Sequence, residues 1–183
     1  MPAARRGRGT WVLAALWLGL AAAPAPAQDN SLELVVKATY LVRFAAFVEW
    51  PQAAFESPTS PLNLCIAGGA LGPVVEQAAS GQAVGQHPIA VRLIAAAAHG
   101  AGCHILFAGG TPQQSVDTAL IAVRREPVLT VTDLPAAAAL KGVINFVMQA
   151  GHVRFEIDER EAAAGGLRIS SQLLALAVNI GAR

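Results

Sequence analysis

Charge is scarce in this sequence. Only 14% of its 183 residues are Asp, Glu, Lys or Arg, against roughly a quarter in typical soluble domains. After the first eight residues no dense cluster of Lys and Arg appears, which argues against a nucleic-acid-binding surface. Hydrophobic residues make up 54% of the chain, and this content excludes an intrinsically disordered protein.

The N-terminus carries the pattern of a secretory signal peptide. Three arginines within the first eight residues precede a continuous apolar run from Trp11 to Ala23, which is too short for a comfortable membrane span. A small-x-small cleavage site follows at Ala25–Ala27, so we expect residues 1–27 to be removed. The mature chain, 28–183, is then a single exported domain with a net charge of −2. We expect it to be periplasmic, with no membrane span after cleavage.

Helical and strand patterns alternate through the mature chain and predict a three-layer α/β sandwich. The sheet is expected to be mostly parallel, with helices on both faces and an antiparallel C-terminal hairpin at one edge. Glu33 and Lys37 are expected to pair on the wetter face of the first helix. The expected helices are 32–50, 72–80, 111–125, 134–140 and 167–180, and the expected strands are 62–67, 89–94, 103–107, 128–131, 143–148 and 153–157.

Cysteine occurs only twice, as Cys65 and Cys103, each within an expected strand. If these strands are neighbours, the oxidising compartment favours a disulfide, worth roughly 3–4 kcal/mol in the chain-entropy model. The alternative is a pair of buried free thiols. Cys103 precedes His104, but adjacent strand residues point to opposite faces, so the two make a poor catalytic dyad.

No catalytic set or metal-ligand spacing emerges from the other polar residues. The histidines lack the spacing of zinc sites, so each is expected at the surface or in a turn. The glycine-rich turn 68–72 lacks the residues of a phosphate-binding loop, and the serines at 170–171 lack a nucleophile elbow. The acidic group near the C-terminus fits structural roles, such as helix capping, better than glycoside hydrolysis. Its members are Glu156, Asp158, Glu159 and Glu161. We therefore expect no catalytic residues, no cofactor and no metal.

Four blocks of sequence together resemble the YfiR-like family of periplasmic proteins. The helix Ala38–Pro51 ends in the pattern F-x-x-F-V-x-W-P, which is similar to the opening helix of that family. The other blocks resemble the family's first strand, its cysteine-bearing third strand, and its closing strand with terminal helix. They are 64–68, 102–107, and 153–158 followed by 166–174. Their order and spacing cover nearly all of the mature chain.

The resemblance implies regulation rather than catalysis. Repressors of this family bind the periplasmic sensor domain of an inner-membrane diguanylate cyclase of the YfiN type and hold it inactive. Such binding lowers cyclic di-GMP and biofilm formation. The resemblance also implies an α/β protein that can form a homodimer; the absence of nucleic acid from its expected partners rests on the charge distribution alone.

Two segments are candidates for contact with such a partner. Aromatic residues widen the apolar stripe of the first helix; they either pack inward, as is usual, or extend onto a partner surface. The segment 167–174 has the same ambiguity, and Arg is a residue type enriched at interface hot spots. The candidates are Phe44, Phe47, Trp50, Leu167, Arg168 and Ile169.

Two other functions remain as alternatives. A small-molecule sensor or carrier without a cyclase partner would use a cleft at the carboxyl ends of the strands. An exported hydrolase would depend on Glu156 or Cys103, and it ranks last because no residues assemble into a mechanism.

Overall fold

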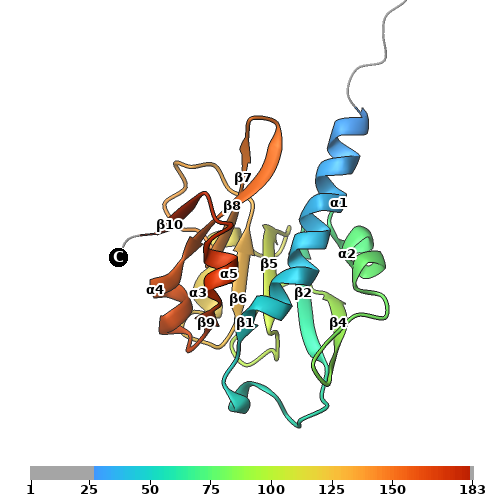
Figure 1. Ribbon diagram of the computed structural model, residues 1–183, viewed down its shortest axis with the longest axis vertical. Coiled ribbons are helices and arrows are strands. Elements are labelled where there is room, and N and C mark those ends of the chain that lie inside the picture. Colours follow the sequence, from blue (N-terminus) through green and yellow to red (C-terminus); the bar gives the residue numbers. More distant parts are fainter. Residues whose placement is uncertain (1–26, 182–183) are drawn as a thin grey trace, which may run out of the picture.

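A computed structural model describes residues 27–181 and shows a central sheet of eight strands with helices on both faces (Figure 1). From one edge to the other the strands are β10 (Asn179–Gly181), β8 (His152–Asp158), β7 (Ile144–Gln149), β6 (Leu129–Thr132), β5 (Ile105–Gly110), β2 (Leu62–Gly68), β4 (His87–Leu93) and β3 (Ala83–Val84). The pairs β4–β2, β2–β5, β5–β6, β6–β7 and β8–β10 are parallel. The pairs β7–β8 and β3–β4 are antiparallel. The predicted α/β sandwich with a mostly parallel sheet is confirmed.

Helices and short turns cover the two faces of this sheet (Figure 1). The helices are α1 (Ala27–Phe44), α2 (Gly72–Ala79), α3 (Val116–Ala122), α4 (Glu159–Ala164) and α5 (Ser171–Leu174), and the 3-10 turns are η1 (Ala45–Phe47) and η2 (Gln52–Ala54). A separate two-stranded ribbon pairs β1 (Val48–Glu49) with β9 (Arg168–Ile169). None of the described helices has both the length and the apolar character needed to cross a membrane.

Alternation along the strands divides the core into two layers. In β2, Leu64 and Ile66 pack with α1 and α2, whereas Cys65 and Ala67 pack with α3 on the opposite face. The larger layer holds an aromatic centre in which Phe44 of α1 lies 5.2 Å from Phe155, measured between ring centroids. A sheet buried on both faces explains the nearly continuous apolar runs of the central strands.

Several predicted elements are corrected by the structure. The predicted helix 32–50 begins earlier, at Ala27, and ends at Phe44, since β1 leaves the helical path to pair with β9. The predicted helix 167–180 is instead β9, α5 and β10. Because β10 pairs beside β8, the confirmed β7–β8 hairpin does not form the sheet edge.

Two further helix predictions differ from the structure. The predicted helix 111–125 is shortened to α3, because Ser115 caps it by accepting the Thr118 amide hydrogen. Residues 134–140 form turns instead of a helix. The expected signal peptide lies outside the described residues, apart from Ala27.

Candidate partner-binding site

The two segments predicted for partner contact lie side by side in the β1–β9 ribbon. Val48 is opposite Ile169, and Glu49 is opposite Arg168, in antiparallel register. The Ser170 amide extends the pairing by donating to the Phe47 carbonyl at 2.9 Å. Residues separated by about 120 positions in the chain therefore form one surface.

Only part of the predicted set is accessible on this ribbon. Arg168 is exposed, and its guanidinium lies 3.2 Å from the carboxylate of Glu49, an exposed pair that contributes little to stability. Phe47, Trp50 and Ile169 are half-buried. The remaining two candidates, Phe44 and Leu167, are buried in the core, which matches the inward-packing alternative for Phe44.

A cluster of aromatic and imidazole rings adjoins the ribbon through Trp50. The Trp50 indole Nε1 donates to the His104 carbonyl at 3.2 Å. Phe55 lies between two imidazoles, with its ring centroid 3.9 Å from that of His87 and 4.4 Å from that of His104. We call Phe55, His87 and His104 the imidazole–phenyl stack. It fastens the loop 51–61 to the sheet beside the ribbon.

His104 is buried, contrary to its predicted place at the surface or in a turn. Its Nδ1 accepts the Asn63 amide hydrogen at 3.0 Å, so Nε2 carries the proton and donates to the Ala54 carbonyl at 3.0 Å. Burial lowers the pKa of the His104 imidazole; the hydrogen bond to Ala54 opposes this shift, and the nearby His87 adds to it. The site therefore holds a neutral imidazole whose two nitrogens are both satisfied.

A disulfide joins Cys65 of β2 to Cys103, the residue before His104, with the two Cα atoms 5.8 Å apart. The predicted bridge is therefore present, although Cys103 precedes β5 instead of lying within it. Since both sulfurs are in the bridge, neither cysteine is a free nucleophile.

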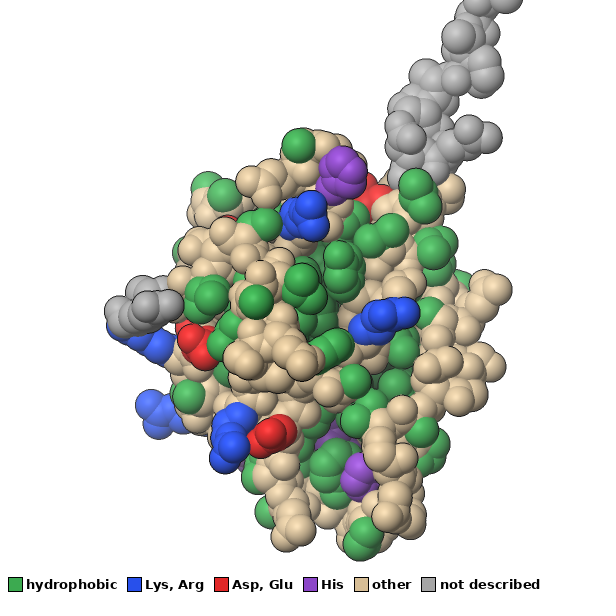
Figure 2. Space-filling model, viewed as in Figure 1, with side chains coloured by type: hydrophobic (Ala, Val, Ile, Leu, Met, Phe, Trp, Pro, Cys, Tyr) green, Lys and Arg blue, Asp and Glu red, His purple; other side chains and the backbone are tan. Residues whose placement is uncertain are grey.

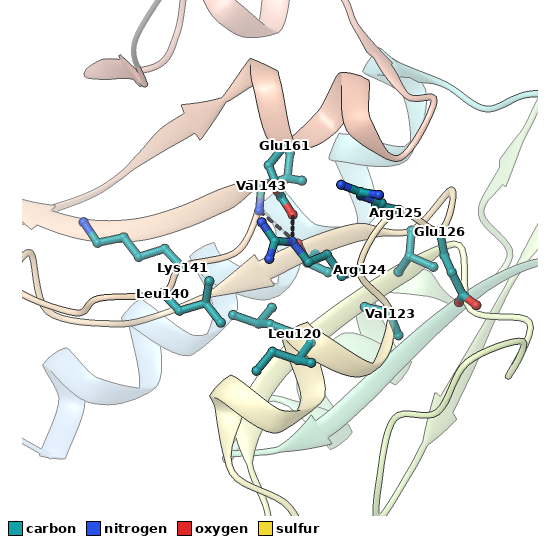
Figure 3. Close-up of a pocket in the computed structure, with 12 residues that line it drawn as sticks. Leu120, Val123, Arg124, Arg125, Glu126, Leu140, Lys141, Val143 and Glu161 are labelled. Carbon is teal, nitrogen blue, oxygen red and sulfur yellow. Dashed lines mark hydrogen bonds and ion pairs between the residues drawn. The ribbon is translucent and has the colours of Figure 1, made fainter.

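The predicted acidic group takes structural roles. Asp158 caps α4 by accepting the amide hydrogens of Arg160 and Glu161. Lys141 lies 3.1 Å from Glu156. Arg124 reaches Glu161 at 3.6 Å across a pocket beside α3, while Lys141 extends away from it (Figure 3). This pocket holds about 30 Å³, the room that one or two waters need, so it does not fit a metabolite.

Larger hollows lie elsewhere. At the carboxyl ends of β2, β5 and β6, where a ligand cleft was predicted, the crevice holds about 160 Å³, below the usual size of ligand pockets. A shallow hollow of about 640 Å³ lies between the loop 51–61 and the β3–β4 turn, lined by Phe55 and His87 among others. Another, of about 460 Å³, lies between α1 and the β7–β8 hairpin, where Figure 2 shows hydrophobic side chains gathered. None of the predicted partner-contact residues lines these three hollows.

The family model that matches this chain is described as YfiR/HmsC-like, and the match covers residues 35–178. The chain belongs to the YfiR/HmsC-like family. No curated protein matches the sequence significantly. The matched range contains both strands of the β1–β9 ribbon, the disulfide and the imidazole–phenyl stack. Membership in the YfiR/HmsC-like family points to a periplasmic regulator of diguanylate cyclase signalling and away from an enzyme.

Sequence reasoning missed the imidazole–phenyl stack. Phe55 lies in a loop rich in proline and serine, which has no hydrophobic periodicity to mark a buried ring. His87 begins β4 and His104 immediately precedes β5, so the spacing of the two histidines in the sequence has no signature. Only the tertiary pairing of β2 with β4 and β5 brings the three rings together.

Proposed function

We propose that this protein binds the periplasmic sensor domain of a membrane-bound diguanylate cyclase and holds the cyclase inactive. Membership in the YfiR/HmsC-like family supports this function. We place the contact with the cyclase at the β1–β9 ribbon, because the ribbon brings the two predicted contact segments together. Its exposed Arg168 and half-buried Ile169, together with the adjoining half-buried Trp50, combine a cation with apolar surface, as interface hot spots do.

Deleting the gene tests the repressor function directly. Intracellular cyclic di-GMP is expected to rise in the deletion strain and to return to the parental level on complementation. An unchanged level, in cells shown to make the protein before deletion, would contradict repression of a cyclase.

Substitutions on the ribbon test the contact surface. Arg168→Glu is expected to weaken binding to the cyclase's periplasmic domain by roughly tenfold or more, measured by calorimetric titration. Arg154→Glu is the matched control, because Arg154 is exposed on β8 in the hairpin and outside the ribbon. The double variant Glu49→Arg/Arg168→Glu restores the cross-strand attraction. Recovery of binding in the double variant would assign Arg168 to holding the ribbon together rather than to contacting the partner.

A small-molecule sensor is the second candidate function, favoured by the hollow of about 640 Å³ beside Phe55 and His87. A ligand in this hollow would raise the melting temperature of the purified protein in proportion to the logarithm of its concentration. Screening periplasmic metabolites by thermal shift, with Phe55→Ala as the control, separates this function from cyclase binding.

A further inference from the structure

An apolar groove lies between α1 and the β7–β8 hairpin. It holds about 460 Å³, which is within the usual size of small-molecule pockets. The apolar and aromatic side chains along it are Leu32, Val36, Tyr40, Met148 and Val153. Leu32 is 64% exposed and Met148 is 52% exposed, so the groove leaves apolar surface in contact with water. Figure 1 shows the hairpin and the start of α1 at the end of the molecule away from β1 and β9.

The spacing of these residues brings them to the two walls of the groove. Leu32, Val36 and Tyr40 follow one another at intervals of four residues, which places them on one face of α1. Met148 lies opposite Val153 across the hairpin, so both side chains project from the same face of the sheet. Because Val153 packs in the core layer that contains α1, this face of the hairpin is the one turned toward the helix. A helical row and a cross-strand pair therefore face each other across the groove.

The charged groups that line the groove differ in whether they have a partner. Glu33 pairs with the buried ammonium of Lys37, so its charge is compensated. Arg154 is exposed and forms no ion pair with an acidic side chain in the described part of the chain. Gly151 and His152 complete the lining at the hairpin turn. The groove thus combines apolar walls with an unpaired guanidinium.

We propose that this groove binds a long-chain fatty acid, with the acyl chain between α1 and the hairpin and the carboxylate at Arg154. The single negative charge of such a molecule complements the unpaired guanidinium, which can donate charge-assisted hydrogen bonds to it. The acyl chain covers Leu32 and Met148, and removing this apolar surface from water favours binding. The unbranched, flexible side chain of Met148 adapts to the shape of the acyl chain. This function is additional to cyclase binding, because no residue of the β1–β9 ribbon lines the groove.

Isotope labelling gives the groove a spectroscopic probe of its own. Residues 28–183 contain one methionine, Met148, and one tyrosine, Tyr40, and both line the groove. The exported, processed protein, labelled at its methionine methyl group, is titrated with dodecanoate below the micellar concentration and followed by NMR. A saturable shift of the Met148 methyl signal is expected, with cross-peaks from this methyl group to the dodecanoate chain. The dispersed amide spectrum is expected to persist, which distinguishes binding from unfolding by a surfactant.

Two further ligands separate the contributions of the acyl chain and the carboxylate in the wild type. Hexanoate is expected to give no saturable shift, because its short chain covers too little apolar surface. Dodecyltrimethylammonium has the same chain length as dodecanoate and the opposite charge. It is expected to bind at least roughly threefold more weakly than dodecanoate, a modest factor because Arg154 is exposed.

A substitution on the wall of the groove tests the location. Leu32→Glu is expected to raise the dodecanoate dissociation constant roughly tenfold or more, because it places a carboxylate against the acyl chain. Leu176→Glu is the matched control, since Leu176 is 61% exposed but lies after α5 and outside the groove. It is expected to leave the dissociation constant unchanged.

Several results would each overturn the proposal. They are the absence of a saturable Met148 shift with dodecanoate, a shift that accompanies loss of the dispersed amide spectrum, equally tight binding of hexanoate or dodecyltrimethylammonium, and a dissociation constant that Leu32→Glu leaves unchanged. The first three are measured on the wild type, so they decide the question even if the variant does not fold. None of these measurements involves a cyclase, so their failure is separate from that of the repressor function.

Discussion

The ring of Phe55 stacks on the imidazole of His104 with 4.4 Å between centroids and 20° between planes. This contact joins the loop that follows Trp50 to the start of β5. Because His104 Nδ1 already accepts the Asn63 amide hydrogen, a second ring proton would cost that hydrogen bond. The stack is therefore built for a neutral imidazole, and its stability depends on pH.

Acidification is expected to destabilise the protein through His104. Burial is the main cause that lowers the pKa of His104 in the folded protein, so the unfolded chain binds this proton more readily. The stabilisation is fully present above the ordinary histidine pKa of about 6.5 and is lost as pH falls below it towards the folded pKa. Urea unfolding at a series of pH values measures this loss.

A histidine comparison isolates the residue responsible. His104→Gln removes the titrating group, so its free energy of unfolding is expected to vary less than that of the wild type between about pH 7 and pH 5. His152→Gln is the control, since His152 is exposed and outside the stack. Equal pH slopes for the wild type and His104→Gln would exclude His104 as the source.

Removing the disulfide is expected to cost about 4 kcal/mol of unfolding free energy, because the bridge closes a loop between residues 38 positions apart. Urea unfolding of Cys65→Ala/Cys103→Ala measures this cost. Reductant is expected to lower the unfolding midpoint of the wild type and to leave that of the double variant unchanged. A wild type equally stable in both conditions would contradict a stabilising role for the bridge.

Removing the two acids beside Lys37 is expected to destabilise the folded protein more than removing Lys37 itself. Its ammonium is buried, lies 2.5 Å from the Asp133 carboxylate and also pairs with Glu33, whereas both acids are partly exposed. Burial acts to lower the pKa of Lys37, but the two acids outweigh it and the net shift is upward. Removing both acids therefore leaves a buried charge unpaired, while removing the lysine leaves two acids that water reaches.

Chemical denaturation tests this asymmetry. Glu33→Gln/Asp133→Asn is expected to cost about 3–5 kcal/mol, whereas Lys37→Met is expected to cost under about 2 kcal/mol. A larger loss for Lys37→Met than for the double variant would show that the attraction itself, rather than the burial of the lysine, controls stability here.

Gly68 is expected to tolerate no side chain. Its φ is +82°, and a Cβ would lie 1.7 Å from the Gly110 carbonyl oxygen, where the ends of β2 and β5 approach each other. Gly68→Ala is therefore expected to cost more than about 3 kcal/mol in urea unfolding. Gly81→Ala is the matched control: Gly81 has φ +70° but open space around it, so a cost of about 1 kcal/mol is expected. Equal costs would mean that backbone conformation alone matters.

Local sequence patterns predicted the elements whose partners are near in the chain. β8 alternates between buried and more exposed residues, and a short turn joins it to the apolar run of β7, so both strands were predicted. The buried runs of β2 and β6 were recognised because central parallel strands are continuously apolar.

The failures occur where distant pairing overrides local periodicity. Ile169, Leu173 and Ile180 have helical spacing, yet Ile169 pairs with Val48 and Ile180 pairs with Ile157 of β8. The strand partners lie far along the sequence, so no local window contains them. The same limit applies to Lys37, which was predicted to lie on the wetter face of its helix but is buried. Its partner Asp133 is 96 residues away, so the local sequence gives no sign of the pairing.

The β1–β9 ribbon also has a consequence for the order in which the molecule is completed. A chain that emerges with its N-terminus first presents β1 long before β9, so Val48 and Glu49 wait for Arg168 and Ile169. Any chain that stops short of residue 168 has the first helix and most of the sheet but no ribbon. The ribbon can therefore close only after Ile169 has been made, and a chain cut short before Arg168 leaves β1 without its partner strand.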